Sequence, residues 1–196
     1  GAAVLSRTLV RADAAVSWKH LFSHALAANP GRLHVAAHSH HLWPDAARAG
    51  HMRAFEDAAR LADQKWSHIF GEIYPQARAH IARELGLPSG ETIAVSPNTH
   101  DFLVRIVSAW PRRPVRILST DGEFHSFRRQ AARWTEDGDV QLERVPLEPA
   151  ETFEQRFLAR ARSGEHDIIF VSHVSYRTGR VFDAAFDLAD IARPEG

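Results

Sequence analysis

Short apolar segments alternate with helical segments through the second half of this chain, and no other feature constrains the fold as strongly. The segments expected to be strands are Thr92–Val95, Val115–Ser119, Val140–Val145 and Asp167–Ser172. The segments expected to be helices are Asn98–Trp110, Ser126–Trp134, Thr152–Arg162 and Asp183–Ala192. Strands that alternate with helices at this spacing are joined by right-handed crossovers and pair in parallel. The sequence therefore predicts an α/β fold, with a mainly parallel sheet flanked by helices.

The first half of the chain is expected to be mostly helical. The elements predicted there are helices at Ser17–Ala28, Pro44–Arg60 and Trp66–Leu85, with a brief strand at His34–Ala37. Gly86 and Pro88 stop the last of these helices. We expect residues 1–64 to form an amino-terminal arm and small-domain helices, and residues 65–196 to form the first part of a larger α/β domain.

Composition excludes several classes of partner. The 24 acidic and 24 basic residues balance, so no overall field attracts nucleic acid or an anionic membrane. No apolar run approaches the roughly 20 residues that span a bilayer, and the amino terminus lacks the apolar core of a signal peptide. The chain has no cysteine, which is compatible with a cytoplasmic protein and excludes disulfides and cysteine metal sites.

The first candidate site is Asp167–Gly179, DIIFVSHVSYRTG. Its continuous apolar run, Ile168–Val171, is typical of a strand buried on both faces of a parallel sheet. Ligands of open α/β sheets bind just beyond the carboxyl ends of strands, so Ser172–Tyr176 lie where a cofactor would be held. The alternative is an ordinary strand end, with Thr178 and Gly179 in a turn before the next element.

A second candidate site is Ser96–His100, SPNTH, which fits the start of a helix. Free backbone N–H groups and the helix dipole favour an anion there, and Thr99 can donate its hydroxyl to a phosphate. Simple capping of the helix by Ser96 or Asn98 is the alternative.

A third candidate site is Thr120–Arg128, TDGEFHSFR, which follows the next strand. An aromatic side chain such as that of Phe124 can stack on a planar heteroaromatic ring. The alternative is that Phe124 and Phe127 are core residues of the helix that follows, which suits Phe127 better than Phe124.

Several histidines gather in Ala36–Pro44, AAHSHHLWP. His38 and His40 share one face of a strand, which allows a metal site, but no HExxH-type motif accompanies them. We favour contact between one of these histidines and a substrate carboxylate or carbonyl; exposed loop histidines are the remaining alternative. The chain has no Gly-x-Ser-x-Gly elbow and no Walker or dinucleotide-binding loop.

Together these segments resemble the kynureninases, fold type I enzymes of the class V aminotransferase-like group that use pyridoxal 5′-phosphate (PLP). SHVSYRTG resembles the segment they carry at the end of a central strand beside the PLP ring, and SPNTH resembles the helix start that binds the cofactor phosphate. GEFHS is similar to their Asn-Phe-Pro-Ser/Thr-Asp, with His125 in place of the proline and Phe127 in place of the aspartate. AAHSHHLWP is similar to Gly-Asn-Ser-Leu-Gly-Leu-x-Pro. The resemblance extends from Leu33 to Ala192.

The resemblance also implies roles for individual residues. It assigns cofactor binding to Thr99, His100, Phe124, Ser126 and Ser172, substrate binding to His38 and Ser39, and no metal ligand. It assigns no catalytic residue, because Lys19 and Lys65 match no anchor position for the cofactor. We expect the anchoring lysine beyond Gly196, and the sheet of this sequence to be incomplete, as in the front part of a longer chain.

The function that the resemblance implies is a PLP-dependent hydrolase of tryptophan catabolism that acts as a homodimer. Such an enzyme cleaves the β,γ carbon–carbon bond of L-kynurenine, or of a related amino acid, and gives anthranilate and alanine from L-kynurenine. The departures HSHH and HSF suit an alternative, an aminotransferase or desulfurase-like enzyme acting on another amino acid. A further alternative is a PLP-free binding domain.

Overall fold

The computed structural model describes residues 17–37 and 40–191, and the chain forms two compact units, Gly1–Ile93 and Ala94–Gly196. The boundary between the units follows Ile93, whereas the expected domain boundary followed residue 64. The difference arises because the helical segments between residues 65 and 84 continue from the preceding helix and contact it.

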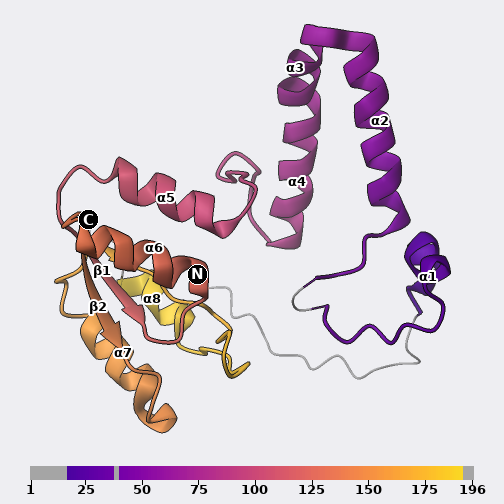
Figure 1. The fold of residues 1–196 in the computed structure, drawn as a ribbon. Coiled ribbons are helices and arrows are strands. Elements are labelled where there is room, and N and C mark those ends of the chain that lie inside the picture. The colour runs from indigo at the N-terminus through magenta and orange to yellow at the C-terminus, as the bar shows by residue number, and fades with distance from the viewer. Residues whose placement is uncertain (1–16, 38–39, 192–196) are drawn as a thin grey trace. The chain divides into compact units, whose positions relative to one another are not determined.

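The first unit consists of helical segments (Figure 1). They are η1 (Lys19–Phe22), α1 (Ser23–Ala28), α2 (Asp45–Leu61), η2 (Ala62–Gln64), α3 (Lys65–His68), η3 (Ile69–Ile73) and α4 (Tyr74–Glu84). The helix predicted at Pro44–Arg60 is confirmed by α2. The helix predicted at Trp66–Leu85 is confirmed as a run of three segments, of which η3 is π-helical. Within the described residues, no helix combines the length and the apolarity needed to cross a membrane.

The brief strand predicted at His34–Ala37 is wrong. The carbonyl oxygen of Ala36 accepts the N–H of His40 at 3.0 Å in a turn, and Val35 is exposed. The segment therefore gains neither a strand ladder nor the buried face that would stabilise a strand.

Gly86 ends α4 as predicted. The N–H of Gly86 donates to Arg83 O at 3.2 Å, and the N–H of Leu87 donates to Ala82 O at 2.8 Å. Gly86 has a φ of +65°, a left-handed conformation that glycine adopts without steric cost. These bonds satisfy carbonyl groups that the end of the helix leaves free.

The second unit contains a parallel three-stranded sheet in the order β2-β1-β3. Its strands are β1 (Val115–Thr120), β2 (Val140–Val145) and β3 (Ile168–Ile169). The predicted α/β class is thus confirmed, as a parallel sheet with flanking helices (Figure 1). The helices are α5 (Thr99–Ala109), α6 (His125–Glu136), α7 (Phe153–Ala161), preceded by η4 (Ala150–Thr152), and α8 (Ala185–Ile191), close to their predicted bounds.

Two of the predicted strands differ from the structure. Thr92–Val95 is not a strand, because Ile93 donates its N–H to Gly90 O in a turn. The strand predicted at Asp167–Ser172 is shorter: its pairing with β1 runs from the N–H of Asp167 to the N–H of Phe170. It ends because the N–H of Ser172 donates to a side chain, the carboxylate of Glu123, at 3.1 Å.

Helices cover both faces of this sheet. On one face, β1 packs against α5 and α6 through a cluster that includes Val107, Ile117 and Phe127; on the other, Leu118 and Phe157 belong to a cluster with α7 and α8. Ile168 and Phe170 pack on the first cluster, and Ile169 and Val171 pack on the second. Both faces of Ile168–Val171 are therefore covered by packed side chains, as predicted. These residues are only half-buried, because β3 pairs with β1 alone among the described strands.

Candidate functional site

The five residues expected to bind a cofactor line one cavity in the second unit. They are Thr99, His100, Phe124, Ser126 and Ser172, and Leu103, Phe127 and Phe170 complete the lining. The cavity has a volume of about 190 Å³. Its residues come from the starts of α5 and α6 and from the end of the β3 segment, so it lies at the carboxyl edge of the sheet. Ligands of open α/β sheets bind at this edge.

The start of α5 contributes Thr99 and His100 to the cavity. The Oδ1 atom of Asn98 accepts the N–H of Asp101 at 3.0 Å and so caps the helix. Of the two residues considered as simple caps, Asn98 therefore has that role. The hydroxyl of Ser96 donates to the carboxylate of Asp101 instead. In the described part of the chain, the backbone N–H groups of Thr99 and His100 have no acceptor.

Asp101 brings a negative charge to the same helix start. The hydroxyl of Ser96, and then the guanidinium of Arg105 at 2.8 Å, hold the pKa of Asp101 below its ordinary value. This carboxylate already offsets part of the helix dipole. An anion in the cavity therefore depends on the Thr99 and His100 groups more than on the dipole.

His100 supplies the strongest sign of a missing partner. Its Nδ1 atom is buried and has no hydrogen-bond partner within the described residues. Buried polar atoms in folded proteins are almost always paired, and an unpaired one costs free energy. Because His100 lines the cavity, a polar group of a ligand placed there can provide the partner.

The two phenylalanines near the start of α6 are placed differently. Phe127 is 3% exposed and stacks on Phe170, with ring centroids 4.0 Å apart and an interplanar angle of 3°. Phe124 is 41% exposed; its ring meets Tyr176 edge-to-face at 4.9 Å and lies tilted against His125 at 4.0 Å. Phe127 is therefore a core residue, as the alternative for this segment expected, whereas Phe124 is partly exposed and lines the cavity, where its ring can contact a planar ligand.

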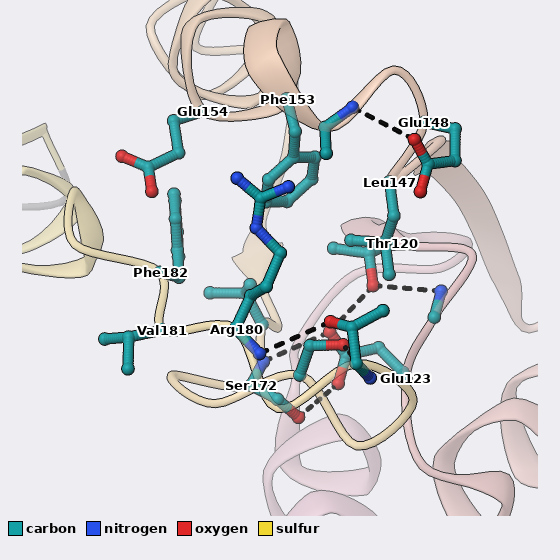
Figure 2. Close-up of a pocket in the computed structure, with 15 residues that line it drawn as sticks. Thr120, Glu123, Leu147, Glu148, Phe153, Glu154, Ser172, Arg180, Val181 and Phe182 are labelled. Carbon is teal, nitrogen blue, oxygen red and sulfur yellow. Dashed lines mark hydrogen bonds between the residues drawn. The ribbon is translucent and has the colours of Figure 1, made fainter.

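Ser172 is held by a buried carboxylate that the sequence analysis did not single out (Figure 2). The hydroxyl of Ser172 donates to Glu123 Oε2 at 2.5 Å, and the N–H of Ser172 and the hydroxyl of Thr120 donate to Oε1 at 3.1 and 2.9 Å. Glu123 is only 3% exposed. With its proton directed at Glu123, the Ser172 hydroxyl presents acceptor lone pairs to a ligand. A lone acidic residue in a turn gives no sequence signal of this role.

A second, smaller cavity lies on the α7 and α8 side of the sheet (Figure 2). Its volume is about 60 Å³, and Thr120, Glu123 and Ser172 line it together with apolar side chains such as Phe153 and Phe182. Glu123 and Ser172 thus join the carboxyl ends of β1 and β3 beside both cavities.

The predicted turn at Thr178 and Gly179 is the tip of a short hairpin. Val174 and Val181 form an antiparallel bridge, and the N–H of Gly179 donates to Ser175 O at 2.8 Å. Gly179 has a φ of +70°, which explains a glycine at this point. The hairpin carries Tyr176 to the ring of Phe124.

The expected substrate residues, His38 and Ser39, lie outside the described residues. His40 and His41 belong to the first unit, where the Nδ1 atom of His41 lies 2.8 Å from Leu42 O. Among the residues that the structure describes, no group of three or more histidine, aspartate or glutamate side chains is placed to hold a metal ion.

Comparison with known proteins gives no relative: no protein-family profile, no curated protein and no solved structure matches this chain.

Proposed function

We propose that the second unit binds PLP in the 190 Å³ cavity, and that the chain serves a PLP-dependent hydrolase resembling kynureninase. The substrate class is L-kynurenine or a related amino acid, cleaved at its β,γ carbon–carbon bond. One observation carries the proposal. The five residues to which the resemblance assigns cofactor binding come from three separate segments, and all five line this one cavity.

Each lining residue suits one part of the cofactor. Thr99 and the free N–H groups at the start of α5 hold the phosphate, and the unpaired Nδ1 of His100 gains a partner there. Phe124 stacks on the pyridine ring, while the hydroxyls of Ser126 and Ser172 form hydrogen bonds with the polar substituents of the ring. When bound, PLP supplies an electron sink for cleavage of bonds in the amino acid.

The second unit carries residues proposed to bind the cofactor but no lysine to anchor it. The lysines of the chain are Lys19 and Lys65, and none lies between residues 94 and 196. The second unit therefore has no lysine of its own to form a Schiff base, and we expect it to bind the cofactor non-covalently. Homodimer formation is part of the same proposal.

Pyridoxamine 5′-phosphate is the probe that tests the proposal, because it lacks the aldehyde that reacts with lysine amines. We expect equilibrium dialysis to show saturable binding to the chain, and much weaker binding of pyridoxamine, which lacks the phosphate. His100→Ala and Phe124→Ala should each weaken binding about tenfold, the size of one lost charged hydrogen bond or stacking contact.

Phe186→Ala is the matched control, since Phe186 is an exposed aromatic of the same unit outside the cavity. Absence of saturable binding would support a PLP-free binding domain. Equal losses in the three variants would show that the probe binds elsewhere. Either result would reject the cofactor site.

A specific observation also favours the second candidate, an aminotransferase or desulfurase-like enzyme. Phe127 stands where the kynureninase motif has an aspartate, and it is buried against Phe170. No carboxylate can reach the cofactor from that position. Competition between the stable secondary-amine adducts that join the phosphopyridoxyl group to L-kynurenine or to L-cysteine, for binding to the chain, separates the two candidates: preference for the L-cysteine adduct supports the second.

A further inference from the structure

A third hollow of the second unit is lined mainly by basic side chains. Its lining residues are Asp121, His125, Arg128, Arg129, Ala132 and Arg144, and its volume is about 460 Å³. They come from α6, the end of β2 and the turn after β1. The hollow shares no lining residue with the proposed cofactor cavity.

The three arginines of this hollow lack the acidic partners that neighbouring arginines have. Within the described residues, Arg128, Arg129 and Arg144 form no ion pair. By contrast, Arg133 on the same helix pairs with Glu136 and Asp137 at 3.2 and 2.9 Å. Arg160 pairs with Glu143, the residue just before Arg144, at 2.5 Å.

The positive charge of the hollow is therefore local and largely uncompensated. Asp121 is the one acidic lining residue, and its Oδ1 atom accepts the N–H of Leu147 at 2.9 Å. The whole chain carries no net charge, so the cluster does not reflect a general basic bias. Like charges that share one concave surface repel each other, and a bound anion removes that cost.

We propose that this hollow binds a small, multivalent phosphate-type anion, such as the diphosphate group of a metabolite. Guanidinium groups match phosphate oxygens with paired hydrogen bonds, and three from two elements can surround one such group. A nucleic acid would need an extended basic stripe, whereas these side chains lie around a single hollow. The proposal stands on this cluster alone and does not depend on PLP binding.

Isothermal titration calorimetry of the full chain with inorganic pyrophosphate, at constant ionic strength, tests the proposal. We expect saturable binding that weakens about tenfold in Arg129→Gln and in Arg144→Gln, and further in the double variant, because each loses a charged hydrogen-bond donor. Arg144→Lys should lose less than Arg144→Gln, since it keeps the charge. Arg162→Gln and Arg177→Gln, exposed arginines outside the hollow, should bind pyrophosphate as the parent does.

Two outcomes overturn the proposal. Affinity that is equal in Arg144→Gln and Arg162→Gln would show that pyrophosphate binds through general charge. Affinity lost in Thr99→Ala and kept in Arg144→Gln would place the anion in the first cavity. The substituted arginines are exposed, so unchanged far-ultraviolet circular dichroism serves as the check that each variant is folded.

Discussion

The two compact units of this chain differ in how far they bury their apolar side chains. Among the described residues, every buried apolar side chain except that of Ala82 lies in the second unit. The first unit instead exposes large apolar side chains along its helices, among them Met52, Phe55, Trp66 and Phe70. Along the helices of this unit, ring contacts join residues one turn apart: Trp66 stacks on Phe70 at 5.9 Å, and Phe70 meets Tyr74 edge-to-face at 5.4 Å.

This difference indicates that different interactions stabilise the helices and strands of the two units. In the second unit, strands and helices gain free energy by burying apolar area against each other. In the first unit, intrinsic helix propensity and contacts between residues one turn apart form the helices. Substitutions in the second unit should therefore change the free energy of unfolding by much more than matched substitutions in the first.

The largest effect is expected for Phe157→Ala. Phe157, on α7, is fully buried, and its ring contacts Phe153 and Phe182, so its loss leaves a cavity and should cost about 3–5 kcal/mol of unfolding free energy. Phe55→Ala, at a position 72% exposed in the first unit, should cost less than about 0.5 kcal/mol. Hydrogen exchange of the full chain, followed on peptides from each unit, measures the change in unfolding free energy that each substitution causes. Equal costs would show that the first unit has a core of its own.

Glu123→Ala comes next. It deprives the hydroxyls of Thr120 and Ser172 and the N–H of Ser172 of their acceptor, so we expect a loss of about 2–4 kcal/mol. Glu72→Ala in the first unit removes a largely exposed partner of His68 and should cost less than about 0.5 kcal/mol. Urea unfolding of both variants measures the two losses. An unchanged free energy of unfolding in Glu123→Ala would contradict a stabilising role for the hydrogen bonds that Glu123 accepts.

Asp167→Asn tests the ion pair that joins β1 to the start of β3. Hydrogen bonds from the Arg116 guanidinium, at 2.8 and 3.1 Å, lower the pKa of Asp167 to about 2. An aspartate in an unfolded chain titrates near pH 3.9, so this stabilisation is complete above about pH 4 and is lost as the pH falls toward 2.

Because Arg116 is nearly half exposed, we expect Asp167→Asn to cost only about 1–2 kcal/mol at pH 6. The difference from the parent should shrink as the pH falls from about 4 to about 2. Urea unfolding at pH 6 and at pH 3 measures it. Asp57→Asn, in a more exposed pair with Arg60, is the control from the first unit. A difference that stays constant with pH would rule out the ion pair as its cause.

The smallest effect is expected for Asn98→Ala, which removes the cap of α5 and should cost about 1 kcal/mol. Helix α2 begins after Pro44, which forms no side-chain cap, so Pro44→Ala should change stability by less than about 0.5 kcal/mol. Hydrogen exchange of the first turn of each helix provides the measurement. A larger loss of stability in Pro44→Ala than in Asn98→Ala would contradict the expectation that the second unit is the more sensitive of the two.

Much of the candidate cavity follows from sequence periodicity and motif. The strand Val140–Val145 and the starts of α5 and α6 were predictable, because each follows a local apolar pattern and a turn. Parallel strands place their carboxyl ends at one edge, which brings Phe124 and Ser172 together after β1 and β3, whereas Thr99 reaches the cavity from the start of α5. The roles of these residues in cofactor binding remain predictions.

From Asn98 onward, the sequence alone determined the order of strands and helices in the second unit, because alternating apolar patterns are local properties of the chain. The tertiary structure decided where β3 ends, since that depends on Glu123, a residue distant in sequence that takes the N–H of Ser172. It also decided that Phe127 stacks on Phe170, and that three arginines share one hollow. Such choices rest on contacts between segments far apart in the chain, which no local pattern encodes.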